Sequence, residues 1–200
     1  MFRGCLILLG LIFLGFDMIP GDPTLPEGVK DFPLIESLED ALKNPQEVYR
    51  LRLRREGLRK IPTAIWSFSN LVELDLSHNK IQYISDSISL LKNLKVLNLS
   101  FNKIKELPPQ IGDLSNLQQM LIYHNRLQTV PAELGRLNKL THLDLWYNEI
   151  STLPDSISRL TSLQEIDLRG MMMSSGIKEK VKRWFPQSRV YTAPDCNCSK

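Results

Sequence analysis

The three histidines of this 200-residue chain carry side chains suited to metal binding and to proton transfer. If His78 and His124 lie two strands apart in one sheet, about 10 Å separates them, whereas a zinc–ligand bond is only about 2 Å long. His142 and Asp144 are spaced to share one face of a strand, but no serine or cysteine completes a catalytic triad with them. Paired carboxylates and a glycine-rich phosphate loop are also missing from the sequence. We therefore predict no metal site, no cofactor and no enzymatic activity.

Two cysteines near the end of the printed sequence, Cys196 and Cys198, form a C-x-C pair. Metal sites usually take four ligands from two such pairs, and the sequence has no second pair. A strained disulfide or a bond to another chain are alternatives. We favour idle thiols in a tail that covers residues 192–200.

A second set of residues suits recognition of a partner rather than catalysis. Exposed aromatic side chains surrounded by polar residues often mark binding sites, and arginines can bind acidic surfaces, lipid phosphates or polyanionic sugars. The rings could instead pack on one another to stiffen a sheet, and the arginines could form a solvated face beside acidic neighbours. The candidate partner-binding residues are Phe101, Leu121, Tyr123, His124, Trp146, Tyr147, Arg50, Arg52 and Arg54.

A 23-residue period predicts the elements that position these side chains. Leucine fills 34 of the 200 positions, and most of these leucines fall into columns of this period. In each unit the fourth and sixth positions are apolar between polar neighbours, which predicts a short strand with one buried face. The ninth position is asparagine in four units, and its amide can bond the backbone of the turn after the strand. The units begin at Val48, Leu71, Leu94, Leu117, Leu140 and Leu163.

The second half of each unit predicts a short helical segment. A proline near position fifteen ends the turn and presets the backbone for a helical turn. Apolar residues then follow at spacings of four and three, which places them on one helix face. A single unit of this size cannot stabilise itself, so the units must stack.

Residues 94–116 read LKVLNLSFNKIKELPPQIGDLSN, and this pattern resembles the leucine-rich repeat family. The resemblance covers about residues 34–191 and is similar to exported bacterial members and to some intracellular signalling scaffolds. It implies a right-handed curved α/β solenoid, with parallel strands on the concave face and short helices or 3-10 turns on the convex face. It also implies that a ligand binds the concave strand face.

Both ends of the repeat array are predicted to be capped, because an open end of the core must be covered. We expect residues 34–48 to form a helix with Leu34, Ile35, Leu38, Ala41 and Leu42 on one side. At the other end we expect a second amphipathic stripe and then a short strand at Val190 and Tyr191. The stripe consists of Ile177, Val181, Trp184 and Phe185.

The first residues follow the pattern of an export signal. Arg3 precedes an apolar run from Cys5 to Phe16, which is shorter than the roughly 20 residues that a membrane-spanning helix needs. We predict a signal peptide or N-terminal hydrophobic segment over residues 1–20, no stable membrane span, and a proline-containing linker over residues 21–33. An uncleaved short anchor or a buried helix is the alternative.

These features together predict an exported, non-catalytic module that binds a protein through its concave strand face. The net charge of +3 is too small to indicate a nucleic-acid partner. The alternative is an intracellular, cytoplasmic leucine-rich repeat scaffold in signal transduction. The oligomeric state and the identity of the ligand stay open, because a fold does not determine a function.

Overall fold

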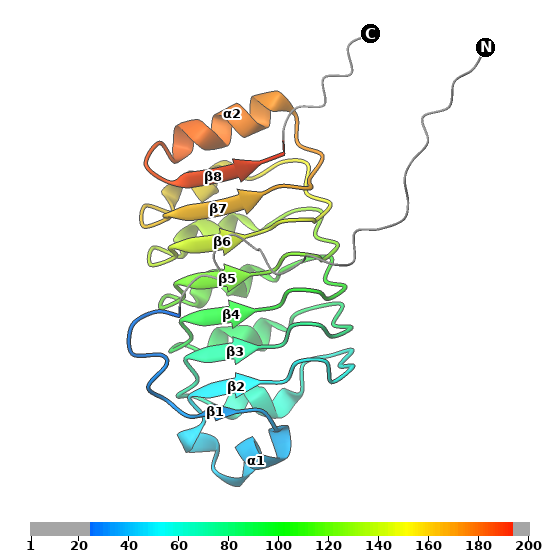
Figure 1. The fold of residues 1–200 in the computed structure, drawn as a ribbon, viewed down its shortest axis with the longest axis vertical. Coiled ribbons are helices and arrows are strands. Elements are labelled where there is room, and N and C mark those ends of the chain that lie inside the picture. Colours follow the sequence, from blue (N-terminus) through cyan, green and yellow to red (C-terminus); the bar gives the residue numbers. More distant parts are fainter. Residues whose placement is uncertain (1–24, 194–200) are drawn as a thin grey trace, which may run out of the picture.

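The computed structural model describes residues 25–193, and eight parallel strands in chain order form its single sheet (Figure 1). Short helices lie behind the sheet, and α1 and α2 lie at its two ends (Figure 1). The strands are β1 (Leu34–Ile35), β2 (Arg50–Arg52), β3 (Glu73–Asp75), β4 (Val96–Asn98), β5 (Gln119–Leu121), β6 (His142–Asp144), β7 (Glu165–Leu168) and β8 (Arg189–Thr192). The predicted signal segment and the cysteine pair lie outside the described residues.

The 23-residue period sets the register of the repeat strands, as predicted. The fourth position of one unit pairs with the fourth position of the next, as in Leu51 with Leu74 and Leu97 with Met120. These side chains are buried, so one continuous core runs the length of the stack. The opposite face of the sheet is left uncovered by any helix of the described chain (Figure 1).

The helical half of each of the first five units is a single 3-10 helix of five residues. Four of the five begin directly after a proline, and η3 begins after Ser85, whose hydroxyl accepts a hydrogen bond from Ser87 N. The five are η2 (Thr63–Ser67), η3 (Asp86–Leu90), η4 (Pro109–Asp113), η5 (Ala132–Arg136) and η6 (Asp155–Arg159). Each buries an apolar side chain against the sheet, which closes the core from behind.

The predicted asparagine ladder is confirmed. Asn79, Asn102, Asn125 and Asn148 are all buried, and each side-chain amide donates to backbone carbonyls of its own unit and of the preceding one. Each side-chain oxygen accepts a backbone N–H from the preceding unit. The turns therefore keep their buried backbone groups bonded from unit to unit.

The first cap differs from the predicted helix. Leu34 and Ile35 form β1 and pair with β2, while α1 covers only Leu38–Lys43 and η1 covers Pro45–Glu47. Ser37 determines where the helix begins, because its hydroxyl accepts from Asp40 N at 3.3 Å, and Pro45 prevents its continuation. Leu42 was expected on the buried side and is 48% exposed.

The last cap is confirmed. Helix α2 (Ser175–Trp184) buries Val181, and Phe185 after it is also buried. Ile177 and Trp184 pack against the same core. Strand β8 then pairs with β7 and completes the sheet.

Candidate partner-binding surface

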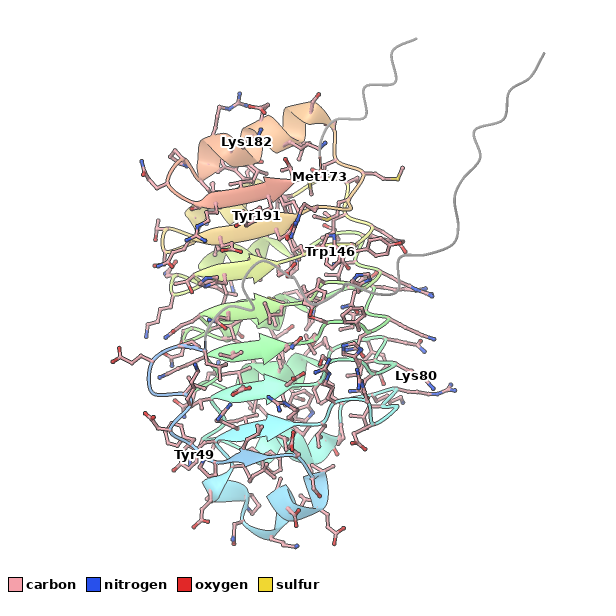
Figure 2. All side chains as sticks on the ribbon, in the orientation of Figure 1. Tyr49, Lys80, Trp146, Met173, Lys182 and Tyr191 are labelled. Carbon is pink, nitrogen blue, oxygen red and sulfur yellow. The ribbon has the colours of Figure 1, made fainter. Side chains whose placement is uncertain are left out.

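The face of the sheet that points away from the core carries the predicted binding residues, and we call it the open sheet face. Positions three, five, seven and eight of each unit contribute to it. It corresponds to the strand face that the sequence predicts to be concave. Figure 2 places Trp146 just beyond the carboxyl end of β6, on the edge where the strands give way to turns.

The turn after each strand holds its position-eight residue in the left-handed region. The φ angles run from 52° to 64° at Arg55, His78, Phe101, His124 and Tyr147. This conformation costs on the order of 1 kcal/mol or more for a residue with a side chain. It persists because the backbone N–H of each of these residues donates to a carbonyl of the next unit, as His124 N does to Trp146 O at 2.9 Å.

Four of these residues form a continuous stack of rings, which we call the ring column. Centroids of His78 and Phe101 are 4.2 Å apart, those of Phe101 and His124 are 4.5 Å apart, and those of His124 and Tyr147 are 4.5 Å apart. The three interplanar angles are 18°, 10° and 27°, so the rings are nearly parallel. The shared left-handed backbone therefore aims four rings along one line.

Tyr123 and Trp146, at position seven, lie beside the ring column. Their ring centroids are 6.0 Å apart, and Trp146 meets His124 edge-to-face at 4.6 Å. Tyr147 is 58% exposed, and Tyr123 and Trp146 are partly exposed. The rings are thus packed against one another, as in the stiffening alternative, and are also accessible from solvent, as binding to a partner would require.

Leu121 contributes less surface than the sequence suggested. It lies in register between Asn98 and Asp144 and is only 8% exposed. Its position in β5 is the one where four of the other five repeat strands carry aspartate or asparagine. Leu121 is therefore a mostly buried apolar residue in this part of the open sheet face.

The arginines of the first repeat divide into two kinds. Arg50 Nε donates to Glu73 Oε2 at 2.5 Å, and its side chain is only 11% exposed. Arg52 pairs with Glu36 at 3.2 Å and lies 3.5 Å from Asp75 Oδ2. Arg54 stays exposed, so the geometry favours Arg54 over Arg50 and Arg52 for contact with a partner.

Two of the three histidines, His78 and His124, pack in the ring column. Arg54 Nη2 lies 3.0 Å from His78 Nε2, and since arginine can only donate, this nitrogen accepts and the ring is neutral. Burial, and then Arg54 and Arg55, lower the pKa of His78, and burial also lowers the pKa of His124 and of His142. Residues 25–193 contain no group of three or more histidine, cysteine or acidic side chains arranged to hold a metal ion.

Position five contains a recurrent hydrogen bond that the sequence analysis missed. The Oδ1 atom of Asp75, Asn98, Asp144 and Asp167 accepts the backbone N–H of the residue two positions later, at 2.9–3.0 Å. This bond fixes the backbone that leads into the left-handed turn. The column of short acidic and amide side chains was the signal that could have revealed it.

Sequence comparisons agree with this architecture. A family model described as "Leucine-rich repeat region" matches residues 91–183, and a second, described as "Leucine rich repeat", matches residues 46–104. Together they span more than half of the chain. The chain is a leucine-rich repeat protein. No curated protein matches it.

Many solved structures share this leucine-rich repeat fold. A leucine-rich repeat protein of Leptospira interrogans has 28% identity and a TM-score of 0.69 over 80% of this chain and 46% of that one. An internalin of Listeria monocytogenes has 19% identity and a TM-score of 0.66, over 82% and 48% of the two chains. The chain thus spans about half the length of these proteins. No helix within residues 25–193 is long and apolar enough to cross a membrane.

Asp144 is the most perturbed acid on the open sheet face of this leucine-rich repeat protein. Burial raises its pKa to about 7, and the charges of Asp167 and Glu165 act in the same direction, while the hydrogen bond from Trp146 N and the charge of Arg169 oppose them. The adjoining Leu121 offers no compensating charge. At position five of three successive repeats the sequence has Leu121, Asp144 and Asp167. This leucine next to two aspartates was the sequence signal for the perturbed pKa of Asp144.

We expect Asp144 to make stability depend on pH. Its pKa in the folded state, about 7, lies above the unfolded value of about 3.9, so between these values the folded chain binds more protons than the unfolded chain. The free energy of unfolding should therefore fall as pH rises through this window, by up to about 4 kcal/mol from this group. Asp144→Asn should match the wild type at pH 4 and be more stable at pH 8 in urea denaturation.

Asparagine is a suitable replacement because Asn98 makes the same backbone hydrogen bond in the third repeat. Equal stability of the two proteins at pH 8 would contradict the assignment.

Proposed function

We propose that this leucine-rich repeat protein is a non-catalytic binding module that recognises a protein partner through its open sheet face. Leucine-rich repeats are a common protein-interaction fold. The observation that carries the proposal is the set of accessible rings formed by Tyr147 of the ring column and by Tyr123 and Trp146 beside it. Tryptophan and tyrosine are among the residues that contribute most to protein–protein affinity.

The rigidity of this surface supports binding. Each ring of the column is held by a stacked neighbour and by a hydrogen-bonded turn, so few rotamers are lost when a partner docks. A surface that is already ordered incurs little of the entropy cost of association. Arg54 lies at one end of the column and adds positive charge at its rim, where it would influence association rates and salt dependence.

Affinity capture tests the proposal. Replacing Tyr123 and Trp146 together by alanine should weaken binding of a captured partner at least 100-fold, because two anchor side chains of this kind each contribute about 2 kcal/mol or more. The matched control is Tyr83→Ala with Leu90→Ala, which removes two side chains that are 51% and 56% exposed outside the open sheet face. Equal capture by the ring variant and the wild type, with both proteins folded, would refute the proposal.

We also propose that the protein is exported. The apolar run from Cys5 to Phe16 after Arg3 supports this location, and so does the resemblance of the repeats to exported bacterial members. The intracellular scaffold is the alternative. Detection of the chain in the cytoplasm with its first residues intact would favour that alternative.

A further inference from the structure

The six repeat strands and their turns place five carboxylates on the open sheet face, and four of them pair with an arginine. Glu73 pairs with Arg50 at 2.5 Å, Asp75 with Arg52 at 3.5 Å, Asp167 with Arg169 at 2.5 Å and Glu165 with Arg189 at 3.7 Å. The fifth, Asp144, forms no ion pair with any residue of the described part of the chain. It is the exception to a rule that the rest of this face follows.

The neighbours of Asp144 leave its charge uncompensated. On one side lies the apolar Leu121 and on the other lies Asp167, both in register with it across the sheet. Arg169, the arginine whose charge acts on Asp144, is already engaged by both oxygens of Asp167. One oxygen of Asp144 accepts Trp146 N, and no side chain of the described residues bonds the other.

Aromatic rings adjoin this carboxylate. Trp146 follows Asp144 by two residues and projects from the same face, and Tyr123 is its counterpart in the preceding repeat, at 6.0 Å between ring centroids. A cation held within about 6 Å of such ring faces is attracted by their quadrupoles. A carboxylate beside accessible rings is therefore complementary to a planar guanidinium, which can stack and donate hydrogen bonds at once.

We propose that the protein partner inserts one arginine side chain against Asp144, beside the rings of Tyr123 and Trp146. The inference rests on the proposed function and names the chemistry of its central contact. The bound arginine completes on Asp144 the ion pair that the other four carboxylates form within the chain. Asp144 is partly exposed, so a partner can reach it.

Binding should then depend on the ionisation of Asp144. The charged groups that face it are Asp167, Glu165 and Arg169, and His142 lies on the same strand. Because burial holds the pKa of Asp144 near 7, its carboxylate loses its charge as pH falls from 8 to 6. We expect the affinity for an arginine-containing partner to fall several-fold over this range.

Peptides selected from a random displayed library on the full wild-type chain at pH 8 provide the probe. We expect the selected peptides to share one arginine next to apolar residues. Binding of a synthetic selected peptide should weaken at least tenfold on Asp144→Asn, and at least tenfold on the wild type when citrulline replaces that arginine. The citrulline exchange should have little further effect on Asp144→Asn. Asp86→Asn removes an exposed charge from η3 and should leave the affinity unchanged.

The outcomes separate the two proposals. Peptides that need Tyr123 and Trp146 but tolerate both citrulline and Asp144→Asn would overturn this inference and leave the proposed function standing. A loss of affinity on Asp144→Asn that the citrulline exchange does not reproduce would also overturn it. A library that yields no peptide dependent on Tyr123 and Trp146 would refute the proposed function and this inference together.

Discussion

Replacing Gly135 by alanine is expected to lower the free energy of unfolding by about 3 kcal/mol or more. Gly135 lies in η5 (Ala132–Arg136), and a Cβ atom added there would lie 2.1 Å from the backbone oxygen of Ser156 in η6. The obstacle is backbone rather than a movable side-chain end, so the two repeats would have to separate. Gly112 is in the same situation in η4, with Glu133 O at 2.3 Å from its added Cβ.

The expected loss of stability in Gly135→Ala comes from the close approach of η6 to η5 and not from the backbone conformation of Gly135. Its φ angle is outside the left-handed region, so alanine would be acceptable there if the neighbouring repeat were absent. Gly176→Ala in α2 is the matched control, because its added Cβ meets nothing closer than Ser174 Oγ at 4.0 Å. That variant should gain up to about 1 kcal/mol from helix propensity. Wild-type stability of Gly135→Ala in urea denaturation would show that the helices are not in contact through this residue.

The 23-residue period made the repeat architecture predictable. Each unit repeats the same apolar positions with no insertion from Val48 onward, so the register of Leu74 with Leu97 follows from the sequence. The asparagine ladder was predictable for the same reason, since a buried amide at a fixed position needs backbone partners at fixed positions. Features that every repeat shares are those that a sequence pattern reveals.

Features that belong to single repeats were harder to predict. In five of the six repeats the residue in the left-handed turn is not glycine, so the sequence does not indicate this conformation. Hydrogen bonds between repeats hold residues such as Phe101 and Tyr147 in it. The pairing of Arg50 with Glu73 depends on side-chain rotamers that spacing does not specify. The first cap is helical, as predicted, but its helix is shorter than residues 34–48, because the prediction followed apolar periodicity and ignored the start signal at Ser37 and the stop signal at Pro45.

The candidate binding residues were predicted to share one face, but their arrangement on it was not predicted. Phe101 and His124 were placed on the correct face, yet their stacking follows from the φ angle of the turn and not from alternation along a strand. Asp144 was considered only as a partner for His142. Its lack of an ion pair depends on which side chains its neighbours engage, as Arg52 pairs with Asp75 and Arg169 with Asp167.

Replacing Asn125 by alanine is expected to lower the free energy of unfolding by about 3 kcal/mol. Asn125 Oδ1 accepts the backbone N–H of Ile104 at 3.0 Å, and Nδ2 donates to the carbonyls of Leu99 and Ile122, each at 3.0 Å. Each carbonyl keeps a second donor, since Asn102 also bonds Leu99 O and Asn148 also bonds Ile122 O. The Ile104 N–H, however, loses its acceptor in a buried turn, which costs about 1–3 kcal/mol beyond the lost amide bonds.

Asn116→Ala provides the comparison, because Asn116 also bonds a backbone carbonyl of the preceding repeat, Lys92 O at 2.9 Å, but does so at the surface. Water can replace that bond, so its loss should cost less than about 1 kcal/mol. Hydrogen exchange adds a local readout, since the Ile104 amide should lose protection in Asn125→Ala and keep it in Asn116→Ala. If both variants unfolded at the same urea concentration, the buried ladder would contribute no more than surface amides do. The turns would then be held by the backbone bonds between repeats alone.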